Sequence, residues 1–333
     1  LAHYLAETGK KVLAIDADPQ CNLTELMLAK EIARLDEIEE KTGQEQSLEG
    51  TSLLSLLKPR IDGDVPKIET TSLETVLIRE NLELLRGDVS LSSIEDSLAE
   101  AHIQRFSNKT HEKRTYIALS DFLTRIGIEK QFDYILIDVG PSSGALTRAC
   151  FLSCDGFFVP TSPDRFNVQA IGTLSTIINR WISEHQEIYQ SFIELELPIK
   201  HGLPQFLGVI LQNYKTHGSQ PKPSYKMWME RIPKKCDDVL FKTLKKYIRN
   251  GIDLTSGLSG PDIVATQIKD FASLGPLMQE HGKPIFKITK DDTRVMDQNH
   301  KPWQGSVWTG AQDRMQEYKN CIAEISKKLE LLK

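Results

Sequence analysis

Short apolar runs that end in a carboxylate or amide side chain are the feature that most constrains the fold of this chain. Such runs end at Asp16, Asp138 and Asn213, and longer stretches with helical spacing separate them. An uninterrupted apolar run is typical of a strand buried on both faces, as in a parallel sheet. The sequence therefore predicts an α/β fold, with a mostly parallel sheet and helices on both faces.

The same reading places the remaining elements along the chain. We expect a single domain over residues 1–333, with helical insertions around 25–75 and 215–270. Expected strands lie within 12–15, 82–88, 132–144, 155–163, 206–214 and 283–288. Expected helices lie in 1–9, 23–58 with a break near Gly43, 91–127, 168–181 and from about 310 onward, with a charged loop over 59–71. The chain begins inside the first of these helices, which suggests an N-terminal truncation.

Composition excludes several classes of protein. The net charge is -5, so any contact with nucleic acid must come from a local basic surface. No apolar run approaches the roughly 18 residues that a membrane span needs. The five cysteines are scattered and complete no zinc pattern, which indicates reduced thiols and a cytoplasmic protein.

The carboxylates at the strand ends indicate a cation. Asp16 and Asp18 stand in "LAIDADPQCNLT", and Asp138 stands in "FDYILIDVGPSSG". Carboxyl ends of parallel strands meet at one edge of the sheet, and carboxylates gathered there repel one another unless a cation lies between them. Mg²⁺ carried by a nucleoside triphosphate is the usual solution, and the second segment fits a Walker B strand followed by a turn that senses the γ-phosphate. For Asp138 alone, a turn-capping role is an equally good interpretation.

Taken together, the two segments resemble the ParA/MinD group of deviant Walker A ATPases, and most closely its ParA branch. "KKVLAIDADPQCNLT" is similar to the first switch of that family, and "FDYILIDVGPSSG" to its Walker B strand and second switch. "LELLRGDVSLSSIEDSLA", "DGFFVPTSPDRFNVQAIGTL", "FLGVILQNY" and "GPLMQEHGKPIF" extend the resemblance to about residue 290. The resemblance implies a P-loop NTPase fold, with ATP and Mg²⁺ as cofactors.

The resemblance also implies roles for single residues. Asp18 matches the aspartate that orients the attacking water, and Asp138 matches the carboxylate that holds Mg²⁺ directly or through water. Asp16 matches the aspartate that supports the metal shell. The remaining nucleotide-site positions are Pro19, Gln20, Gly140, Asn213 and Pro284. For Asn213, a turn-forming asparagine after a strand is an equally good interpretation.

One defining motif of the family is not found in residues 1–333. The sequence K-G-G-x-G-K-[ST], whose backbone amides cradle the phosphates, does not occur. We expect the first strand and this loop to precede Leu1, so that the chain as given would be inactive although the intact protein is an ATPase.

A basic segment is the candidate for DNA contact. In "RIPKKCDDVLFKTLKKYIRN" (231–250), helical spacing puts Lys242, Lys245, Lys246 and Arg249 on one face, where they could contact phosphates without reading bases. An ordinary solvated helix face is at least as good an interpretation. The last helix mixes both charges on its polar side, which disfavours a membrane-binding role.

The sequence as a whole predicts an ATP-dependent dimeric switch in DNA partition or in the positioning of cellular cargo. Its expected partners are a second copy of the chain, non-specific DNA and a centromere-binding or other activator protein, with no membrane. The alternatives are an ATPase with another cargo, and a non-catalytic scaffold or inactive fragment that keeps the fold to bind a protein partner.

Overall fold

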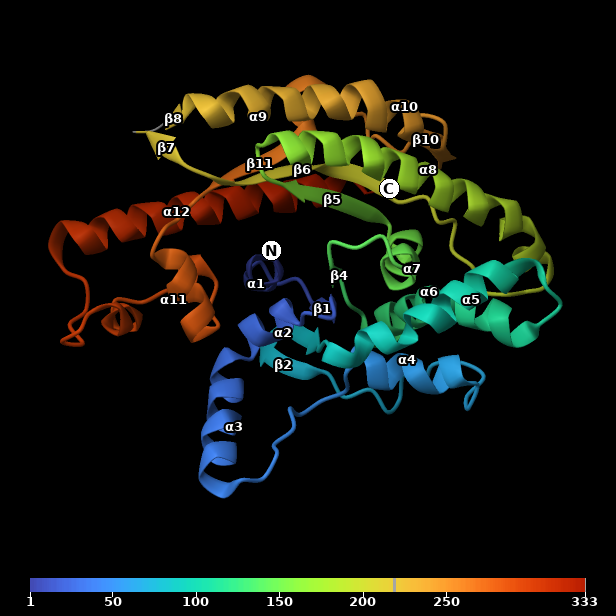
Figure 1. Ribbon diagram of the computed structural model, residues 1–333, viewed down its shortest axis with the longest axis horizontal. Coiled ribbons are helices and arrows are strands. Elements are labelled where there is room, and N and C mark those ends of the chain that lie inside the picture. Colours follow the sequence, from blue (N-terminus) through green and yellow to red (C-terminus); the bar gives the residue numbers. More distant parts are fainter. Residues whose placement is uncertain (218–219, 333) are drawn as a thin grey trace. The chain divides into compact units, whose positions relative to one another are not determined.

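The computed structural model describes residues 1–217 and 220–332 (Figure 1). The chain divides into two compact units. The first comprises residues 1–118, 122–147 and 271–320, and the second comprises 119–121, 148–270 and 321–333. We describe each unit by itself, and the expectation of one domain stays a prediction.

The first unit is built around a four-stranded sheet with the order β2-β3-β1-β4. Its strands are β1 (Val12–Ala17), β2 (Val76–Arg79), β3 (Leu82–Leu85) and β4 (Tyr134–Val139). Its helices are α1 (Ala2–Glu7), α2 (Asn22–Met27), α3 (Ala29–Thr42), α4 (Leu53–Asp62), α5 (Glu95–Ile103), most of α6 (Thr110–Lys130), α11 (Leu274–His281) and the first part of α12 (Gly305–Lys328). Short 3₁₀ turns are η1 (Val89–Ile94), η2 (Gln104–Phe106), η5 (Ile285–Lys287) and η6 (Asp291–Met296).

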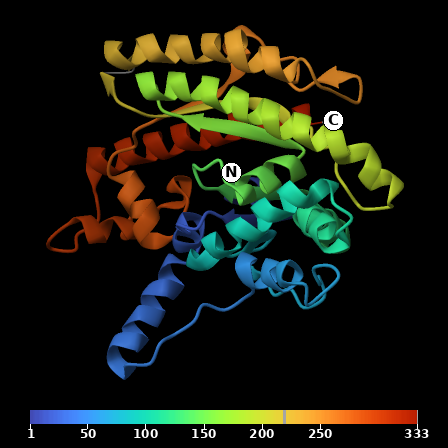
Figure 2. The same cartoon turned by 45° about the vertical axis from the view of Figure 1, so that its right-hand side comes forward.

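Strand β1 is the centre of this sheet because it pairs in parallel with both β3 and β4. All six of its residues are buried. Helices α1, α2 and α4 contact β1, and β2 adds an antiparallel edge. Helix α1 ends before Gly9, whose φ of +82° suits glycine, so the chain turns directly into the strand as predicted. Helix α3 extends away from the sheet of this unit (Figure 2) and buries none of its residues.

The second unit holds a three-stranded parallel sheet with the order β11-β6-β5. Its strands are β5 (Gly156–Thr161), β6 (Gln205–Tyr214) and β11 (Val264–Lys269), with two small hairpins, β7 (Thr216–His217) with β8 (Gln220–Pro221) and β9 (Ile248–Arg249) with β10 (Ile252–Asp253). Its helices are most of α7 (Ala145–Ser153), α8 (Arg165–Glu194), α9 (Pro223–Lys235), the π-helix η3 (Cys236–Leu240), α10 (Phe241–Leu244), and the short turns η4 (Gly260–Ile263) and η7 (Leu329–Leu331).

The core of the second unit lies between β6 and helices α8 to α10. Ile178 of α8, Phe206 of β6 and Ile232 of α9 are fully buried in one cluster. Helices α8 and α9 lie side by side (Figure 1) and contact each other. Burying whole side chains of this size contributes roughly 1.5–3 kcal/mol each, so this cluster is a main source of the unit's stability.

The mostly parallel α/β fold predicted from the sequence is confirmed, but several element predictions are wrong. In place of the strand predicted over 283–288, Ile285–Lys287 form a 3₁₀ turn. Helix α4 continues through Pro59 to Asp62, so the loop begins at Gly63. Strands β2 and β11 were not predicted, and α8 is much longer than expected. Among the described residues, no helix has the length and apolar content to span a bilayer, and none of the five cysteines forms a disulfide.

Candidate functional site: carboxylates at the ends of β1 and β4

The first unit brings two of the predicted carboxylates onto neighbouring strands. Strands β1 and β4 run parallel, and Asp16 is the register partner of Asp138. Neighbouring strands lie about 4.8 Å apart, so both side chains occupy the same edge of the sheet. Asp18 follows directly after the end of β1 and is 9% exposed. The predicted cluster of three aspartates at the strand ends is therefore present.

Asp16 is fully buried and organises the chain that follows β1. Its Oδ2 accepts hydrogen bonds from the backbone amide of Thr24 at 2.8 Å and from the Thr24 hydroxyl at 2.7 Å. Its Oδ1 accepts one from the amide of Asp18 at 3.2 Å. The Thr24 hydroxyl in turn accepts from the amide of Gly87 at 2.8 Å. One carboxylate thus ties β1, α2 and the segment after β3 together.

Asp18 is held by a tight turn and by a glycine. Its Oδ1 accepts a hydrogen bond from the amide of Gln20 at 3.0 Å, and its carbonyl accepts from the amide of Cys21 at 2.9 Å. Pro19 stands inside this turn, where its fixed φ suits the geometry. A methyl group on Gly140 would lie 2.8 Å from Asp18 Oδ1, so only glycine allows this approach. The two switch segments predicted from sequence therefore meet at Asp18 and Gly140.

Asp138 is the aspartate of the cluster whose pKa is shifted. Partial burial raises its pKa to about 6, and repulsion from the charges of Asp16 and Asp18 adds to the effect. Its surface is nevertheless still open to solvent at the end of β4. In the described part of the chain, no lysine or arginine forms an ion pair with any of the three carboxylates. An unneutralised cluster with one open carboxylate is a suitable environment for a cation.

The residues present fit Mg²⁺ only if other ligands complete its shell. Within residues 1–217 and 220–332, no group of three His, Cys, Asp or Glu side chains is arranged to hold a metal. Asp16 uses both oxygens in hydrogen bonds, which leaves Asp138 as the accessible carboxylate. Mg²⁺ commonly takes one or two carboxylates and fills its other positions with water and phosphate oxygens. The direct metal role of Asp16 stays a prediction.

The loop after β4 is fixed by a carboxylate that sequence reasoning did not single out. Glu95, the first residue of α5, accepts hydrogen bonds from the amides of Ala145 at 2.6 Å and Leu146 at 3.2 Å. These amides are the unsatisfied donors of the first turn of α7. A methyl group on Gly144 would come within 2.8 Å of Glu95 Oε1. The segment from Gly140 to Gly144 thus lies against the Asp18 carboxylate at its start, and hydrogen bonds to Glu95 fix the residues just after its end.

Two predicted base-site residues have different settings. Asn213 lies in the second unit, exposed near the end of β6, with a φ of +60° where the pairing with β11 shifts register. That conformation is typical of an asparagine in a bulge within a strand, whereas the alternative interpretation was a turn after the strand. Pro284 lies in the first unit, next to the η5 turn, and lines a pocket with His3 and Arg79. The base-contacting roles of both stay predictions.

The predicted basic helix is wrong as a single element. Helix α10 ends at Leu244, and Arg249 belongs to the short strand β9. The Arg249 guanidinium forms an ion pair with Asp155 at 3.2 Å and donates a hydrogen bond to its carbonyl at 3.0 Å. Its side chain is 17% exposed, so it is a structural residue. Lys242, Lys245 and Lys246 remain exposed in the second unit.

Sequence reasoning missed the residues that support the aspartates. Thr24 lies inside the segment "LAIDADPQCNLT", but its hydroxyl is informative only once the Gly87 amide is known to reach it. Cys21 adopts a left-handed conformation with φ of 56° just before α2. No local pattern distinguishes Glu95 from its acidic neighbours, because its partners are 50 residues away.

A family model described as AAA domain (AAA_31) matches residues 1–190, which is more than half of the chain and contains the whole carboxylate cluster. The chain belongs to this family, and within it to the ParA/MinD type. The expected family is thereby confirmed.

Curated relatives are distant in sequence. An uncharacterized protein of Methanocaldococcus jannaschii is 23% identical over 70% of this chain and 73% of its own length. The chromosome partitioning protein ParA of Caulobacter vibrioides is 27% identical over 54% of this chain and 55% of its own. The chain thus spans only about half the length of most curated relatives that it matches.

Two solved structures share the fold. Protein DIP2308 from Corynebacterium diphtheriae superposes with a TM-score of 0.63 at 21% identity, over 84% of this chain and 90% of its own. The ATP complex of a single-residue variant of McdA from Cyanothece superposes with a TM-score of 0.55 at 16% identity, over 97% of this chain and 90% of its own. At these identities the likeness concerns the fold alone.

Proposed function

We propose that the intact protein is a ParA-like ATPase that acts as an ATP-dependent dimeric switch in DNA partition or in positioning another cellular cargo. The observation that carries the proposal is the cluster of Asp16, Asp18 and Asp138, which lies at one edge of a parallel sheet without a described cation partner. Membership in the ParA/MinD-type family is consistent with this role, and so is the ATP in the McdA structure.

The residues of the cluster divide the chemistry between them. Asp138 is the open carboxylate that would hold Mg²⁺, directly or through water. Asp16 keeps α2 attached to β1 and so fixes the segment that carries Asp18. Asp18 is positioned by Gln20 and Gly140 to accept a hydrogen bond from an attacking water. The bound metal would supply neutralisation of phosphate charge, as in other phosphoryl-transfer sites.

The phosphate-binding loop is the part that this proposal requires beyond residues 1–333. Strand β4 stands at the end of its four-stranded sheet, and Val139 is 39% exposed there. A further parallel strand beside β4 would cover this apolar edge and end in the loop. The proposal therefore pairs the required first strand with β4.

DNA contact and protein partners complete the proposal. Lys242, Lys245 and Lys246 are the exposed cations that would contact phosphates, and dimerisation would double their number. The protein would act in the cytoplasm, away from membranes. An activator protein, which binds centromeric DNA or another cargo, would stimulate hydrolysis.

The test is nucleotide binding and hydrolysis by the intact gene product, which includes the coding sequence upstream of Leu1. We expect ATP binding that depends on Mg²⁺, and hydrolysis that falls by roughly 10²-fold or more in Asp18→Ala while binding persists. Asp36→Ala, on exposed α3, is the matched control and should retain both activities. A gene product without a K-G-G-x-G-K-[ST] loop and without ATP binding would overturn the ATPase proposal.

A non-catalytic scaffold is the second candidate. It is favoured by the lack of a glycine-rich phosphate loop in residues 1–333 and by the full use of Asp16 in structural hydrogen bonds. In that case a protein partner should bind equally with and without ATP.

A further inference from the structure

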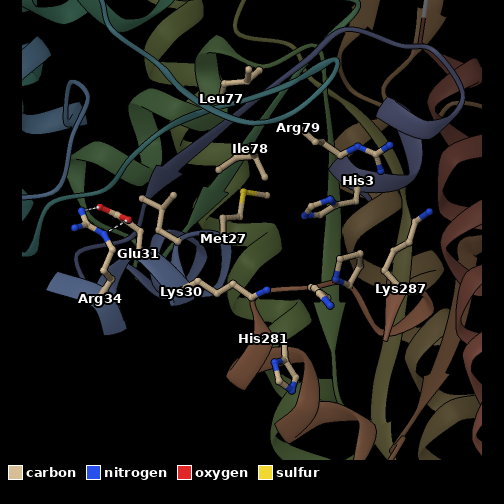
Figure 3. Close-up of a pocket in the computed structure, with 14 residues that line it drawn as sticks. His3, Met27, Lys30, Glu31, Arg34, Leu77, Ile78, Arg79, His281 and Lys287 are labelled. Atoms are coloured by element: carbon tan, nitrogen blue, oxygen red, sulfur yellow. Dashed lines mark hydrogen bonds and ion pairs between the residues drawn. The ribbon is translucent and has the colours of Figure 1, made fainter. Parts of the chain in front are cut away.

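The first unit contains a second polar site, which is a pocket of about 860 Å³. Its walls come from α1, the start of α3, the edge strand β2 and the segment from α11 to η5 (Figure 3). None of the three aspartates of the carboxylate cluster lines it. The pocket is therefore separate from the carboxylate cluster, although Pro284, a predicted nucleotide-site residue, is part of its lining.

The pocket is rich in positive charge. Its lining includes five lysine and arginine side chains, namely Lys30, Arg34, Arg79, Lys283 and Lys287, and a single carboxylate, Glu31. An excess of cations on a concave wall attracts anions, and the low-dielectric surroundings strengthen the attraction.

Neighbouring carboxylates neutralise this charge only in part. Glu31 pairs with Arg34, and Asp292 pairs with Lys283 at 2.8 Å. Glu7 alone serves three cations, since it lies 3.1 Å from Arg79, 2.6 Å from Lys287 and 3.4 Å from Lys319.

Lys30 is the cation that is left over. Among the described residues it has no ion-pair partner, and Figure 3 shows its amine pointing toward the side of the pocket that carries His3 and Lys287. Burial and the neighbouring positive charges lower the pKa of His3 to about 4, so this ring is neutral near pH 7. The pocket thus carries positive charge that is not fully neutralised at two places. One is near Lys30, and the other is the part of the lining formed by Arg79 and Lys287, here called the Arg79–Lys287 wall.

The shape of the lining indicates an extended chain as the ligand. Leu77, Ile78 and Arg79 are consecutive residues of β2, and all three line the pocket. Side chains alternate between the two faces of a strand, so a pocket lined by three in succession runs along the strand edge. Strand β2 is the last strand of its sheet, and Leu77 is 71% exposed. An edge strand offers backbone donors and acceptors to a further strand.

We propose that this pocket binds an extended, acidic peptide segment of a partner protein. The segment adds as a strand to the outer edge of β2, its carboxylates contact Lys30 and the Arg79–Lys287 wall, and an apolar side chain covers Leu77. Charge complementarity selects the acidic sequence, and the strand edge selects the extended conformation.

The test measures binding of a fluorescein-labelled peptide of alternating glutamate and valine by fluorescence anisotropy. We expect saturable binding that weakens as salt is raised, and an affinity about tenfold lower in Lys30→Glu. Lys41→Glu is the matched control because Lys41 lies on the same helix outside the pocket. It should bind the peptide as the wild type does.

Two further probes distinguish this proposal from simpler anion binding. Peptides with alternate amides N-methylated, one for each register, test strand pairing without changing the protein. We expect one register to lose binding. Equal binding of both N-methylated peptides, or equal loss in Lys30→Glu and Lys41→Glu, would overturn the proposal. Displacement of the peptide by pyrophosphate or ATP would also overturn it, because the pocket would then be a phosphate or nucleotide site.

Discussion

At the scale of single residues, the site depends on partners that lie far away in sequence. Asp16 and Asp18 stand two positions apart in one motif, yet their environments differ. Asp16 is enclosed by Thr24 and the Asp18 amide, whereas Asp18 lies against Gly140. The motif therefore predicted where the carboxylates stand, and the long-range contacts determine what each of them does.

The Thr24 hydroxyl should be worth a measurable part of the fold's stability. It donates to buried Asp16 and accepts from the Gly87 amide, so Thr24→Val removes one of the two hydrogen bonds to Asp16 Oδ2 and leaves the Gly87 amide without this acceptor. We expect the free energy of unfolding to fall by about 1–3 kcal/mol in urea titrations. Thr24→Ser, which keeps the hydroxyl, should lose less than half of that. Equal losses in the two variants would contradict a role for the hydroxyl.

Asp138 should make stability depend on pH in a defined direction. Its pKa in the folded protein is about 6, above its ordinary value of 3.8, so the folded state binds this proton more tightly than the unfolded chain does. Its contribution is therefore fully present below about pH 4 and is lost as the pH rises through 6. We expect Asp138→Asn to be more stable than the wild type at pH 7.5, and the gap to close as the pH falls to 4.

Denaturant titrations across that range check this prediction. Asp36→Asn, on exposed α3, serves as the control and should follow the wild type at every pH. A gap that stays constant or widens on acidification would show that Asp138 does not carry a raised pKa.

At the scale of elements, the sequence predicted the long buried strands and missed the short amphipathic ones. Strand β1 is apolar throughout its predicted part, and burial on both faces leaves a clear signal. Strand β2 has only four residues, none of them fully buried, and its apolar run of three residues is too short to identify a strand. "KPIFKI" is rich in apolar residues like a short strand, but Ile285–Lys287 form a 3₁₀ turn. Ile285 and Ile288, which are three residues apart, are both buried.

The hydrogen bonds of the Glu95 carboxylate should keep the loop before α7 in one conformation. Glu95→Gln removes the charge that interacts with the amides of Ala145 and Leu146, while the side chain keeps its length. We expect these two amides to exchange hydrogen faster and the protein to lose about 1 kcal/mol of stability. Asp96→Asn, the next residue on α5, should change neither. Unchanged exchange in Glu95→Gln would mean that the loop is ordered by other contacts.

At the scale of the whole molecule, charge limits how DNA could be held. The net charge is -5, so an interaction with phosphates must come from local cations such as Lys242, Lys245 and Lys246. The sequence predicted this segment as one helix. It did not reveal that Arg249 is committed to Asp155, because that pairing joins residues 94 apart.

Salt dependence tests this basic surface. In a plot of the logarithm of the DNA-binding constant against the logarithm of the salt concentration, three phosphate contacts per protomer predict a slope near -3. A dimer with six contacts should give a slope near -6. We expect Lys242→Ala to lower the magnitude of the slope by about one per protomer in anisotropy titrations with duplex DNA. Arg249→Ala removes the ion pair with Asp155, so we expect it to lower the free energy of unfolding. In the folded protein it should leave the slope of the salt dependence unchanged. A slope that responds to Arg249 and not to Lys242 would place the DNA surface elsewhere.

The open side of β4 has a consequence for how the polypeptide behaves in solution. Residues 134–139 pair along one edge with β1 and have no described strand partner along the other, and Tyr134 to Ile137 are partly buried. An unpaired strand edge can form backbone hydrogen bonds with a strand of a second molecule. High protein concentration should therefore drive residues 1–333 into growing assemblies rich in β-structure. The negative charge of Asp138 near the end of β4 opposes pairing with a second copy, because the two carboxylates would repel each other. Lowering the pH toward the Asp138 pKa of about 6 neutralises this charge and should weaken the repulsion. Colloidal stability at high concentration and near-neutral pH would thus depend on whether this edge of β4 is covered.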